Sequence, residues 1–249
     1  MGLRPALPEL MRATIRLLAV IAMTVVTQAQ DPLETLPHAY TRVFENSAVD
    51  VIRAYYRPHE KLAVHDHSQF PTVYVYLSNS GPVRFTHVEE NPFTMVRPPL
   101  QMGMFRVSPG RLEKHEVENL GDIPSEFLRV ELKNVPLRTL HEFRGKPGFD
   151  LTRTTETTEY ASPALSIVRI IVAGEAGVRA FTAPRPTLLI AFTPAIVATQ
   201  SSSPVQLKRG DVYWLERGGS VRVSTTEGGA AHLLALAIDD KKSEQREGS

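Results

Sequence analysis

The sequence contains no cysteine, which excludes disulfide bonds, a thiol nucleophile and a cysteine-borne lipid anchor. It also lacks an excess of one charge, since 28 Lys and Arg stand against 27 Asp and Glu, so neither nucleic acid nor an anionic membrane is indicated as a partner. The GXSXG, P-loop and GXGXXG patterns are absent. Beyond the first 29 residues, no apolar run reaches the roughly 20 residues of a membrane-spanning helix.

The first 29 residues have the features of a secretory signal peptide. Arg12 and Arg16 make a basic segment, residues 17–26 form an apolar core, and Thr27 and Ala29 are small residues suited to a cleavage site. The apolar core is too short to span a bilayer. We therefore predict export to the periplasm or the medium and no membrane association after cleavage, the alternatives being a buried helix and an uncleaved anchor. Cleavage leaves 25 of the 28 basic and 26 of the 27 acidic residues.

The rest of the chain has the pattern of a β protein. Hydrophobic residues make up 42% and charged residues 22%, which is ordinary for a globular domain. The 19 prolines and 15 glycines are spread along the chain, which favours many short elements. Short runs of β-branched and aromatic residues between turn residues predict strands, and their spacing favours a barrel or a sandwich. The clearest of these runs are residues 50–56, 62–67, 72–77, 83–87, 105–107 and 127–132.

The second half of the chain repeats the first, which predicts a duplicated domain. The offset between matching residues drifts because loop lengths differ. The matches are Val51–Arg53 with Ile167–Arg169 at 116 residues, Pro71–Leu77 with Pro186–Phe192 at 115, and Gly103 and Gly121 with Gly210 and Gly228 at 107. Between the halves, residues 137–143 are expected to form one or two helical turns.

His65 and His67 are the first candidates for a functional site. Residues i and i+2 of a strand point to the same face, so both imidazoles can reach one point in space. Asp66 points to the opposite face and is not expected to join them. His115 follows about fifty residues later and supplies a third imidazole. Three neutral imidazoles can bind Zn, Fe, Cu, Ni or Mn; the alternative is a hydrogen-bonded polar cluster inside a barrel.

At these positions the sequence resembles the cupin superfamily, whose barrels carry the motifs G(X)5HXH(X)3,4E(X)6G and G(X)5PXG(X)2H(X)3N. His65 and His67 fit the HXH element, and His115 and Asn119 fit H(X)3N. Gly103, Pro109 and Gly110 fit the rest of the second motif with a residue or two of slippage. The resemblance covers about residues 48–133 and, through the repeat, more faintly 160–240. It implies an all-β fold of two RmlC-like jelly-roll barrels, and it implies no particular reaction.

The resemblance also implies a ligand set of two His, one Glu and a later His. Thr72 stands at the Glu position and cannot supply a carboxylate. Gln69 is a weaker candidate for an oxygen ligand. Thr72, Tyr74 and Tyr76 share one strand face and are expected to line the pocket above the histidines.

The remaining titratable residues are assigned to structure or surface. We expect His59 and His87 to be solvated and His232 to lie in the core or at an edge. Glu113, Glu116 and Glu118 are expected to form a solvated charged turn, the alternative being that one of them supports His115 by contact with its ring. In the second half the site is lost, which predicts a degenerate barrel. The positions of His65, His67, His115 and Asn119 are taken there by Phe181, Ala183, Arg222 and Thr226.

The predicted organisation is a signal peptide (1–29), an N-terminal cupin barrel with the metal site (30–136), a linker (137–158), a degenerate C-terminal barrel (159–240) and a disordered tail (241–249). Two functions stay open. One is a divalent transition metal (Fe, Zn, Mn, Ni or Cu) at His65, His67 and His115, with oxygenase- or isomerase-type chemistry on a small molecule. The other is a metal-free cupin that binds a small ligand or serves as a scaffold. A homodimer is compatible with the sequence, although no residue requires one.

Overall fold

The computed structural model describes residues 31–174, 177–226 and 229–239. The predicted signal peptide and tail lie outside these residues. Within them the chain is almost entirely β, with one short helix, α1 (Pro32–Thr35), before the first strand. No helix among the described residues has the length and apolar character to cross a membrane.

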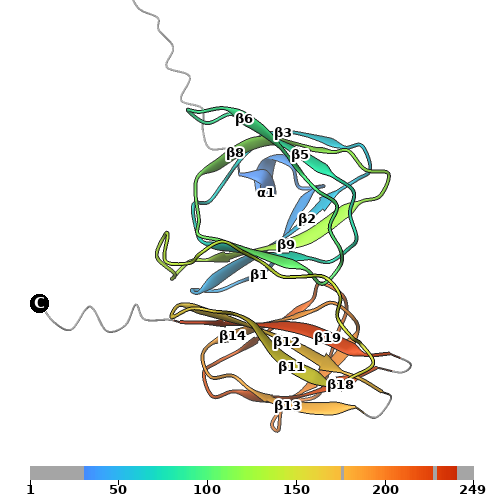
Figure 1. Ribbon diagram of the computed structural model, residues 1–249. Helices are drawn as coiled ribbons and strands as arrows, with labels where there is room; N and C mark the ends of the chain where they lie inside the picture. Colours follow the sequence, from blue (N-terminus) through green and yellow to red (C-terminus); the bar gives the residue numbers. More distant parts are fainter. Residues whose placement is uncertain (1–30, 175–176, 227–228, 240–249) are drawn as a thin grey trace, which may run out of the picture.

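The first barrel consists of a large and a small antiparallel sheet (Figure 1). The large sheet has the order β1-β2-β9-β4-β7-β10, and the small sheet has the order β3-β8-β5-β6. The strands are β1 (Tyr40–Glu45), β2 (Val49–Tyr56), β3 (Lys61–His67), β4 (Thr72–Tyr76), β5 (Val83–His87), β6 (Phe93–Arg97), β7 (Phe105–Ser108), β8 (Glu113–Asn119), β9 (Ser125–Leu132) and β10 (Phe143–Arg144).

The second barrel has the same plan, with a large sheet of order β11-β12-β19-β14-β17 and a small sheet of order β13-β18-β15-β16. Its strands are β11 (Thr155–Ala161), β12 (Leu165–Val172), β13 (Val178–Thr182), β14 (Thr187–Ala191), β15 (Ala195–Ala198), β16 (Val205–Leu207), β17 (Val212–Leu215), β18 (Ser220–Thr225) and β19 (Ala231–Ile238). The predicted all-β fold of two barrels is therefore confirmed.

Equivalent strands of the two barrels are separated by the same offsets as the matching segments of the sequence. Strand β12 begins 116 residues after β2, β14 begins 115 after β4, and β17 begins 107 after β7. Gly103 and Gly210 make the same turn before β7 and β17, with φ of 87° and 82°, where a side chain would be strained. Gly103 donates its N–H to the carbonyl of Tyr76, the last residue of β4, and Gly210 donates to the carbonyl of Ala191, the last residue of β14.

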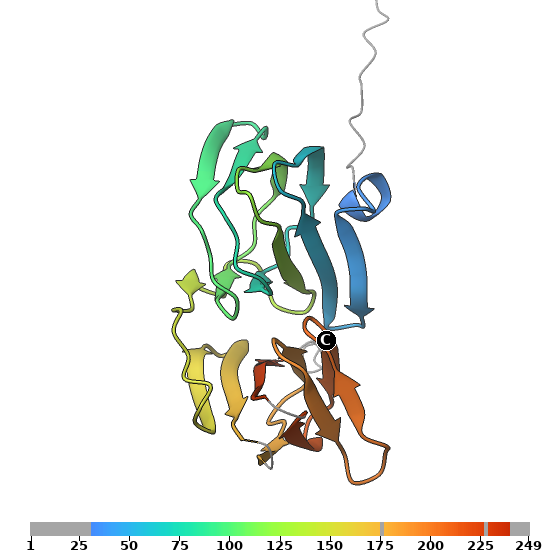
Figure 2. The ribbon, with the colours of Figure 1, turned by 90° about the vertical axis from the view of Figure 1, so that its right-hand side faces the viewer.

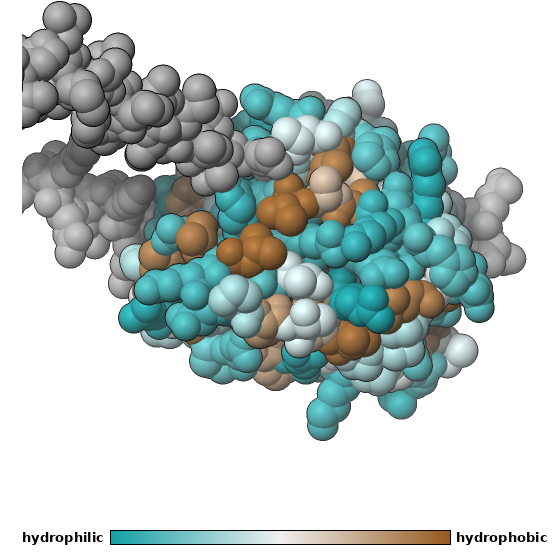
Figure 3. Space-filling view, turned by 90° about the horizontal axis from the view of Figure 1, so that it is seen from above, coloured by the Kyte–Doolittle hydropathy of each residue, from teal (hydrophilic) through white to brown (hydrophobic). Residues whose placement is uncertain are grey.

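The two large sheets pack face to face, so their strands are buried on both sides (Figures 1 and 2). In β4, Val73 and Val75 join the core between the barrels, whereas Tyr74 and Tyr76 point into the first barrel. All five residues of β4 are buried, and so are all eight of β19. The period of two thus assigns alternate residues of one strand to two cores, and it directs Tyr74 and Tyr76 toward the histidines. The outer face that carries α1 and the small sheet is mostly hydrophilic, with separate apolar patches (Figure 3).

Three local expectations differ from the structure. Residues 40–45, which lie outside the runs predicted as strands, form edge strand β1, which pairs with β2. Residues 137–143 contain no helix; β10 instead extends the large sheet by pairing with β7, and β11 begins at Thr155, so two strands fall in the segment predicted as a linker. Thr155, Thr157 and Thr158 are β-branched, which suits a strand.

The equivalence proposed for His115 in the second barrel is also off by one residue. Phe181 pairs with Val221, which is buried, whereas Arg222 is exposed. A bulge in β3, between Leu62 and His65, shifts the pairing with β8 in the first barrel. Apolar Phe181 and Val221 therefore occupy the places of His65 and His115, which supports the loss of the site.

Candidate metal centre

His65, His67 and His115 converge inside the first barrel from neighbouring strands β3 and β8. His65 lies directly opposite His115 in the ladder, and the pair is 0% and 4% exposed. The ring centroids are 4.8 to 5.1 Å apart, and one nitrogen of each ring lies within 4.8 Å of the other two. Asp66, as predicted, points away, toward Lys114.

This donor set fits a divalent transition metal. Among the described residues, both ring nitrogens of His115 are buried without a hydrogen-bond partner, which is costly unless another group uses them. Imidazole nitrogens about 2.1 Å from a tetrahedral ion lie about 3.4 Å apart. The rings would therefore move toward one another by about 1 Å on binding, a shift within the reach of side-chain rotation.

All three histidines are held in the neutral form that metal binding requires. Burial lowers the pKa of His115 to about 3, even though the nearby Glu113 carboxylate opposes this effect. Burial, aided by the Arg129 charge, places the pKa of His67 well below its usual value. Burial likewise lowers the pKa of His65. The lone pairs are therefore available throughout the neutral pH range.

Tyr40 competes for one of these lone pairs. His65 Nδ1 lies 2.8 Å from the carbonyl of Ala63 and donates to it, so Nε2 has no proton and accepts from the Tyr40 hydroxyl at 2.8 Å. The Tyr40 oxygen in turn lies 2.8 Å from the Tyr56 hydroxyl. Burial raises the pKa of Tyr40 well above 10, which keeps its proton in place. Tyr40 must therefore turn its hydroxyl hydrogen away before His65 can bind an ion through Nε2.

Replacing Tyr40 with Phe is expected to raise the affinity of the cluster for Zn²⁺ about fivefold, because a competing hydrogen bond worth about 1 kcal/mol is removed. A competition titration against a chromophoric chelator measures the change. Tyr56→Phe is the matched control, since it leaves the Tyr40–His65 bond in place, and it should bind Zn²⁺ as the wild type does. Weaker binding by Tyr40→Phe would show that the hydroxyl supports the bound ion instead.

Glu113 is part of the site, contrary to the prediction of a solvated turn. It is 6% exposed and faces inward two residues before His115, directly opposite His67 in the ladder. Its Oε2 accepts hydrogen bonds from Tyr74 at 3.0 Å and from Arg129 at 2.8 Å. Burial alone would raise the pKa of Glu113, but the Arg129 charge lowers it to about 2. A fixed carboxylate therefore lies beside the three histidines, although Thr72 stands where the resemblance implied a Glu ligand.

His87 was also expected to be solvated and is instead 2% exposed. It lies opposite His115 on β5, with ring centroids 5.1 Å apart. Its Nδ1 is 3.1 Å from Glu89, and its ring stacks on Phe93. The other assignments agree with the structure: Glu116 and Glu118 form ion pairs on the outer face, His59 is exposed and His232 is buried.

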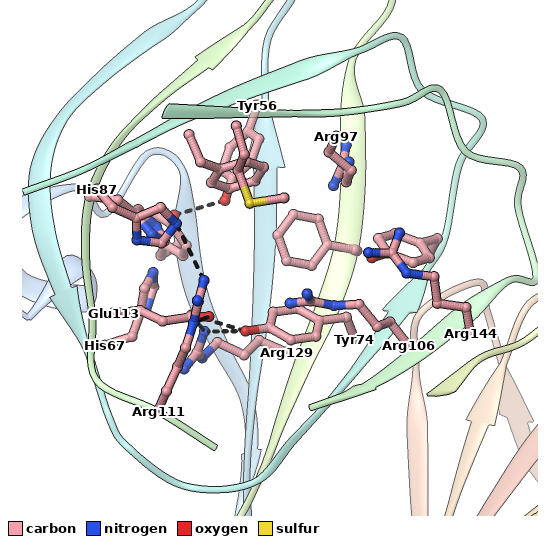
Figure 4. Close-up of a pocket in the computed structure, with 16 residues that line it drawn as sticks. Tyr56, His67, Tyr74, His87, Arg97, Arg106, Arg111, Glu113, Arg129 and Arg144 are labelled. Atoms are coloured by element: carbon pink, nitrogen blue, oxygen red, sulfur yellow. Dashed lines mark hydrogen bonds and ion pairs between the residues drawn. The ribbon is translucent and has the colours of Figure 1, made fainter. Parts of the chain in front are cut away.

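A cavity of about 60 Å³ extends from the histidines across the barrel (Figure 4). One water molecule needs roughly 10–15 Å³ of cavity volume, so this cavity suits a ligand of only a few non-hydrogen atoms. Tyr74 and Tyr76 line it, as expected from their strand face. Thr72 and Gln69 do not: Thr72 lies at the end of β4 with its hydroxyl donating to the carbonyl of Phe70, and Gln69 is exposed in the loop before it.

Asn119 has a structural role. Its amide nitrogen lies within 3.2 Å of the carbonyls of Tyr56, Arg57 and Ile123, and its side-chain oxygen accepts from the N–H of Gly121. It thereby ties β8 to the loops at its end. The sequence reading missed the arginines of the cavity and Tyr40; alternation along β9, which places Arg129 and Glu131 on one face with Phe127, carried a signal for Arg129.

The sequence matches no protein-family model and no curated protein sequence. Solved structures are nevertheless similar over most of the chain. AerE from Microcystis aeruginosa aligns with a TM-score of 0.57 at 11% identity, covering 81% of this chain and 97% of AerE. YhaK from Escherichia coli gives 0.54 at 12% identity, covering 85% and 98%. Oxalate decarboxylase from Bacillus subtilis gives 0.52 at 12% identity, covering 84% and 70%. At these identities the likeness establishes the fold and leaves the chemistry to the site.

Proposed function

The chain has the cupin fold, and from that premise we propose that its first barrel binds one divalent transition metal (Fe, Zn, Mn, Ni or Cu) through His65, His67 and His115. The observation that carries the proposal is the buried His115 ring, whose two nitrogens have no partner although they face two other neutral imidazoles. Three imidazoles without a carboxylate suit these borderline ions better than Mg²⁺ or Ca²⁺.

The proposal includes turnover of a small molecule, of the oxygenase or isomerase type. A bound ion would supply a Lewis acid or an O₂-binding centre. Around it, the chain offers the Tyr74 hydroxyl and the Glu113 carboxylate, both fixed by Arg129. The Glu113 carboxylate, which Arg129 keeps ionised, offers a fixed negative charge beside the ion, while the walls of the cavity limit water and fix the orientation of a substrate.

The second candidate is a cupin that binds a small ligand, or acts as a scaffold, without metal. Two observations favour it: Thr72 replaces the expected carboxylate ligand, and Tyr40 already satisfies His65 in the structure. A metal-free cupin does not explain why the buried His115 nitrogens have no partner among the described residues. For that reason the metal site is preferred.

Export is proposed as well, on the basis of residues 1–29 alone: a basic segment, a short apolar core and small residues before the cleavage site. Expression of the full chain followed by intact-mass measurement of the exported fraction tests it, and a mature chain that begins at Gln30 is expected. A chain that keeps residues 1–29 in the cytoplasm would contradict export and leave the metal proposal untouched.

Metal analysis of the purified protein tests the main proposal. After exposure to each of the five ions, we expect about one ion per chain in the wild type and a loss of at least tenfold in the His65→Ala/His67→Ala variant. His59→Ala is the matched control, because His59 is exposed on the same barrel, and it should keep the ion. A wild type that binds none of the ions rules out the first function, and one ion per chain that the double variant loses rules out the metal-free alternative. Circular dichroism verifies that each variant is folded.

A further inference from the structure

The cavity beside the histidines carries a strong excess of positive charge. Five of the described residues that line it are arginines, and one, Glu113, is a carboxylate. Arg129 is neutralised by Glu113 and Glu131, at 2.8 and 2.7 Å. Arg111 also pairs with Glu113, at 3.5 Å. Among the described residues, the other three arginines, Arg97, Arg106 and Arg144, form no ion pair with a carboxylate of the cavity. A barrel interior with this balance favours an anionic ligand.

Arg97 is the clearest uncompensated charge. It is 7% exposed, and its Nη2 donates to the hydroxyls of Ser125 and Ser80, at 2.8 and 3.3 Å. Its Nε is buried and has no partner in the part of the chain that the structure describes. No Asp or Glu in the described part of the chain forms an ion pair with it, and the neutral rings of Tyr76 and Phe127 lie 5.4 and 5.9 Å away. A buried guanidinium without an anion is costly, so this position is explained by a ligand that supplies one.

Arg106 stands next to it on the same wall. Its guanidinium lies over the Tyr74 ring at 4.4 Å, and no carboxylate of the described residues pairs with it. The charge of Arg106 is among the influences that lower the pKa of Arg97, after the larger effect of burial. Figure 4 shows both arginines on the side of the cavity opposite His67 and His87. The two arginines thus concentrate positive charge at one end, with aromatic walls between them and the histidines.

We propose that Arg97 and Arg106 bind the carboxylate of a small organic acid whose other end faces His67 and His115 of the candidate metal centre. This inference rests on the proposed function, because the other end of the acid would face the metal ion that these histidines are proposed to bind. Guanidinium groups bind carboxylates through paired, charge-assisted hydrogen bonds, for which the unpartnered Nε of Arg97 is available. The volume of about 60 Å³ limits the ligand to a short acid.

Calorimetric titration with malonate tests the proposal, with malonamide as the uncharged analogue of the same shape. We expect malonate to bind the wild type and malonamide to bind at least about thirtyfold more weakly, as the loss of charge-assisted bonds implies. Arg97→Gln and Arg106→Gln should each weaken malonate binding at least about tenfold. Arg84→Gln is the matched control: Arg84 pairs with Glu118 outside the cavity, so malonate affinity should not change.

Several results would overturn the carboxylate site: equal binding of malonate and malonamide, tighter binding of inorganic phosphate than of malonate, or unchanged affinity in both cavity variants. If Arg97→Gln fails to fold, Arg106→Gln, whose side chain is only partly buried, decides the question. Metal content measured on the same samples separates the two proposals. Malonate binding without any metal supports the arginine site and rejects the metal site, whereas metal binding without malonate binding rejects the arginine site alone.

Discussion

Replacing Arg129 with Met is expected to lower the free energy of unfolding by about 3–5 kcal/mol at pH 7, because it leaves two buried carboxylates without their cation. Arg129 is 3% exposed and bonds to Glu113, Glu131 and the Tyr74 hydroxyl. It also donates to the carbonyl of Ser68, in the loop after the strand of His65 and His67. The change therefore affects both the stability of the first barrel and the position of the candidate metal centre.

Urea unfolding of the metal-free protein measures this loss. Arg84→Met is the matched control, since Arg84 and Glu118 form an exposed pair whose removal should cost less than about 1 kcal/mol. The pKa of Glu113 is depressed in the folded wild type to about 2, so its contribution is complete above the ordinary Glu range and disappears as the pH falls toward 2. The difference between wild type and Arg129→Met should narrow over that range. Equal losses in the two variants at pH 7 would show that the buried network adds no stability.

The sequence predicted the histidine cluster because strand alternation is a local rule. His65 and His67 share a face by the period of two, and His115 needed only a neighbouring strand to bring it close. The repeat was equally visible, since the matched segments proved to be the strands β2 and β12, and β4 and β14. The fold and the core of the site thus followed from patterns within single segments.

The charges inside the barrel could not be read in the same way. Most of residues 111–118 are charged, so the segment resembles a solvated edge, yet Glu113 shares the inward face with His115. Its burial depends on Arg129, which lies on another sheet and becomes a partner only after both sheets have closed. The burial of Arg97 similarly depends on the hydroxyls of Ser80, in the segment after β4, and of Ser125, at the start of β9.

The pairing register of the strands was the second feature that the sequence did not predict. The single-residue shift that replaces Arg222 by Val221 at the position opposite Phe181 arises from a bulge in β3 of the first barrel. A one-residue slip turns every side chain to the other face of a sheet. The offset within each matched segment therefore identified equivalent strands but not equivalent side chains. Direct pairing across the sheet is needed to say which residue replaced a ligand.

The contact between the barrels contains a buried histidine outside the candidate metal centre, which predicts a pH-dependent stability. His232 is 0% exposed, lies between Phe149 and Phe192, and accepts a hydrogen bond from Arg169 through Nε2 at 2.6 Å. Its Nδ1 has no partner. Arg169 also bonds to the carbonyl of Gly103, so this group links the second barrel to the turn before β7. Burial, followed by the Arg169 charge, lowers the pKa of His232 to about 3.

The unfolded chain binds a proton at this residue below about pH 6.5, whereas the folded protein keeps the ring neutral until about pH 3. The contribution of His232 to stability is therefore complete above pH 6.5 and declines as the pH falls toward 3. Between pH 7.5 and 5.0 this one group should cost the wild type about 2 kcal/mol, and His232→Gln, which has no titrating ring, should lose that much less over the same interval.

Urea unfolding at the two pH values, in the presence of EDTA, gives this difference, because the contributions of His65, His67 and His115 are common to both proteins and cancel. An equal loss of stability in His232→Gln at both pH values reflects packing and does not affect the comparison of the two pH dependences. His59→Gln serves as the control: His59 is exposed beside Asp122, so the wild-type pH dependence should persist. An unchanged pH dependence in His232→Gln would mean that the contact between the barrels admits a protonated imidazole, and that acid acts on the protein through other groups.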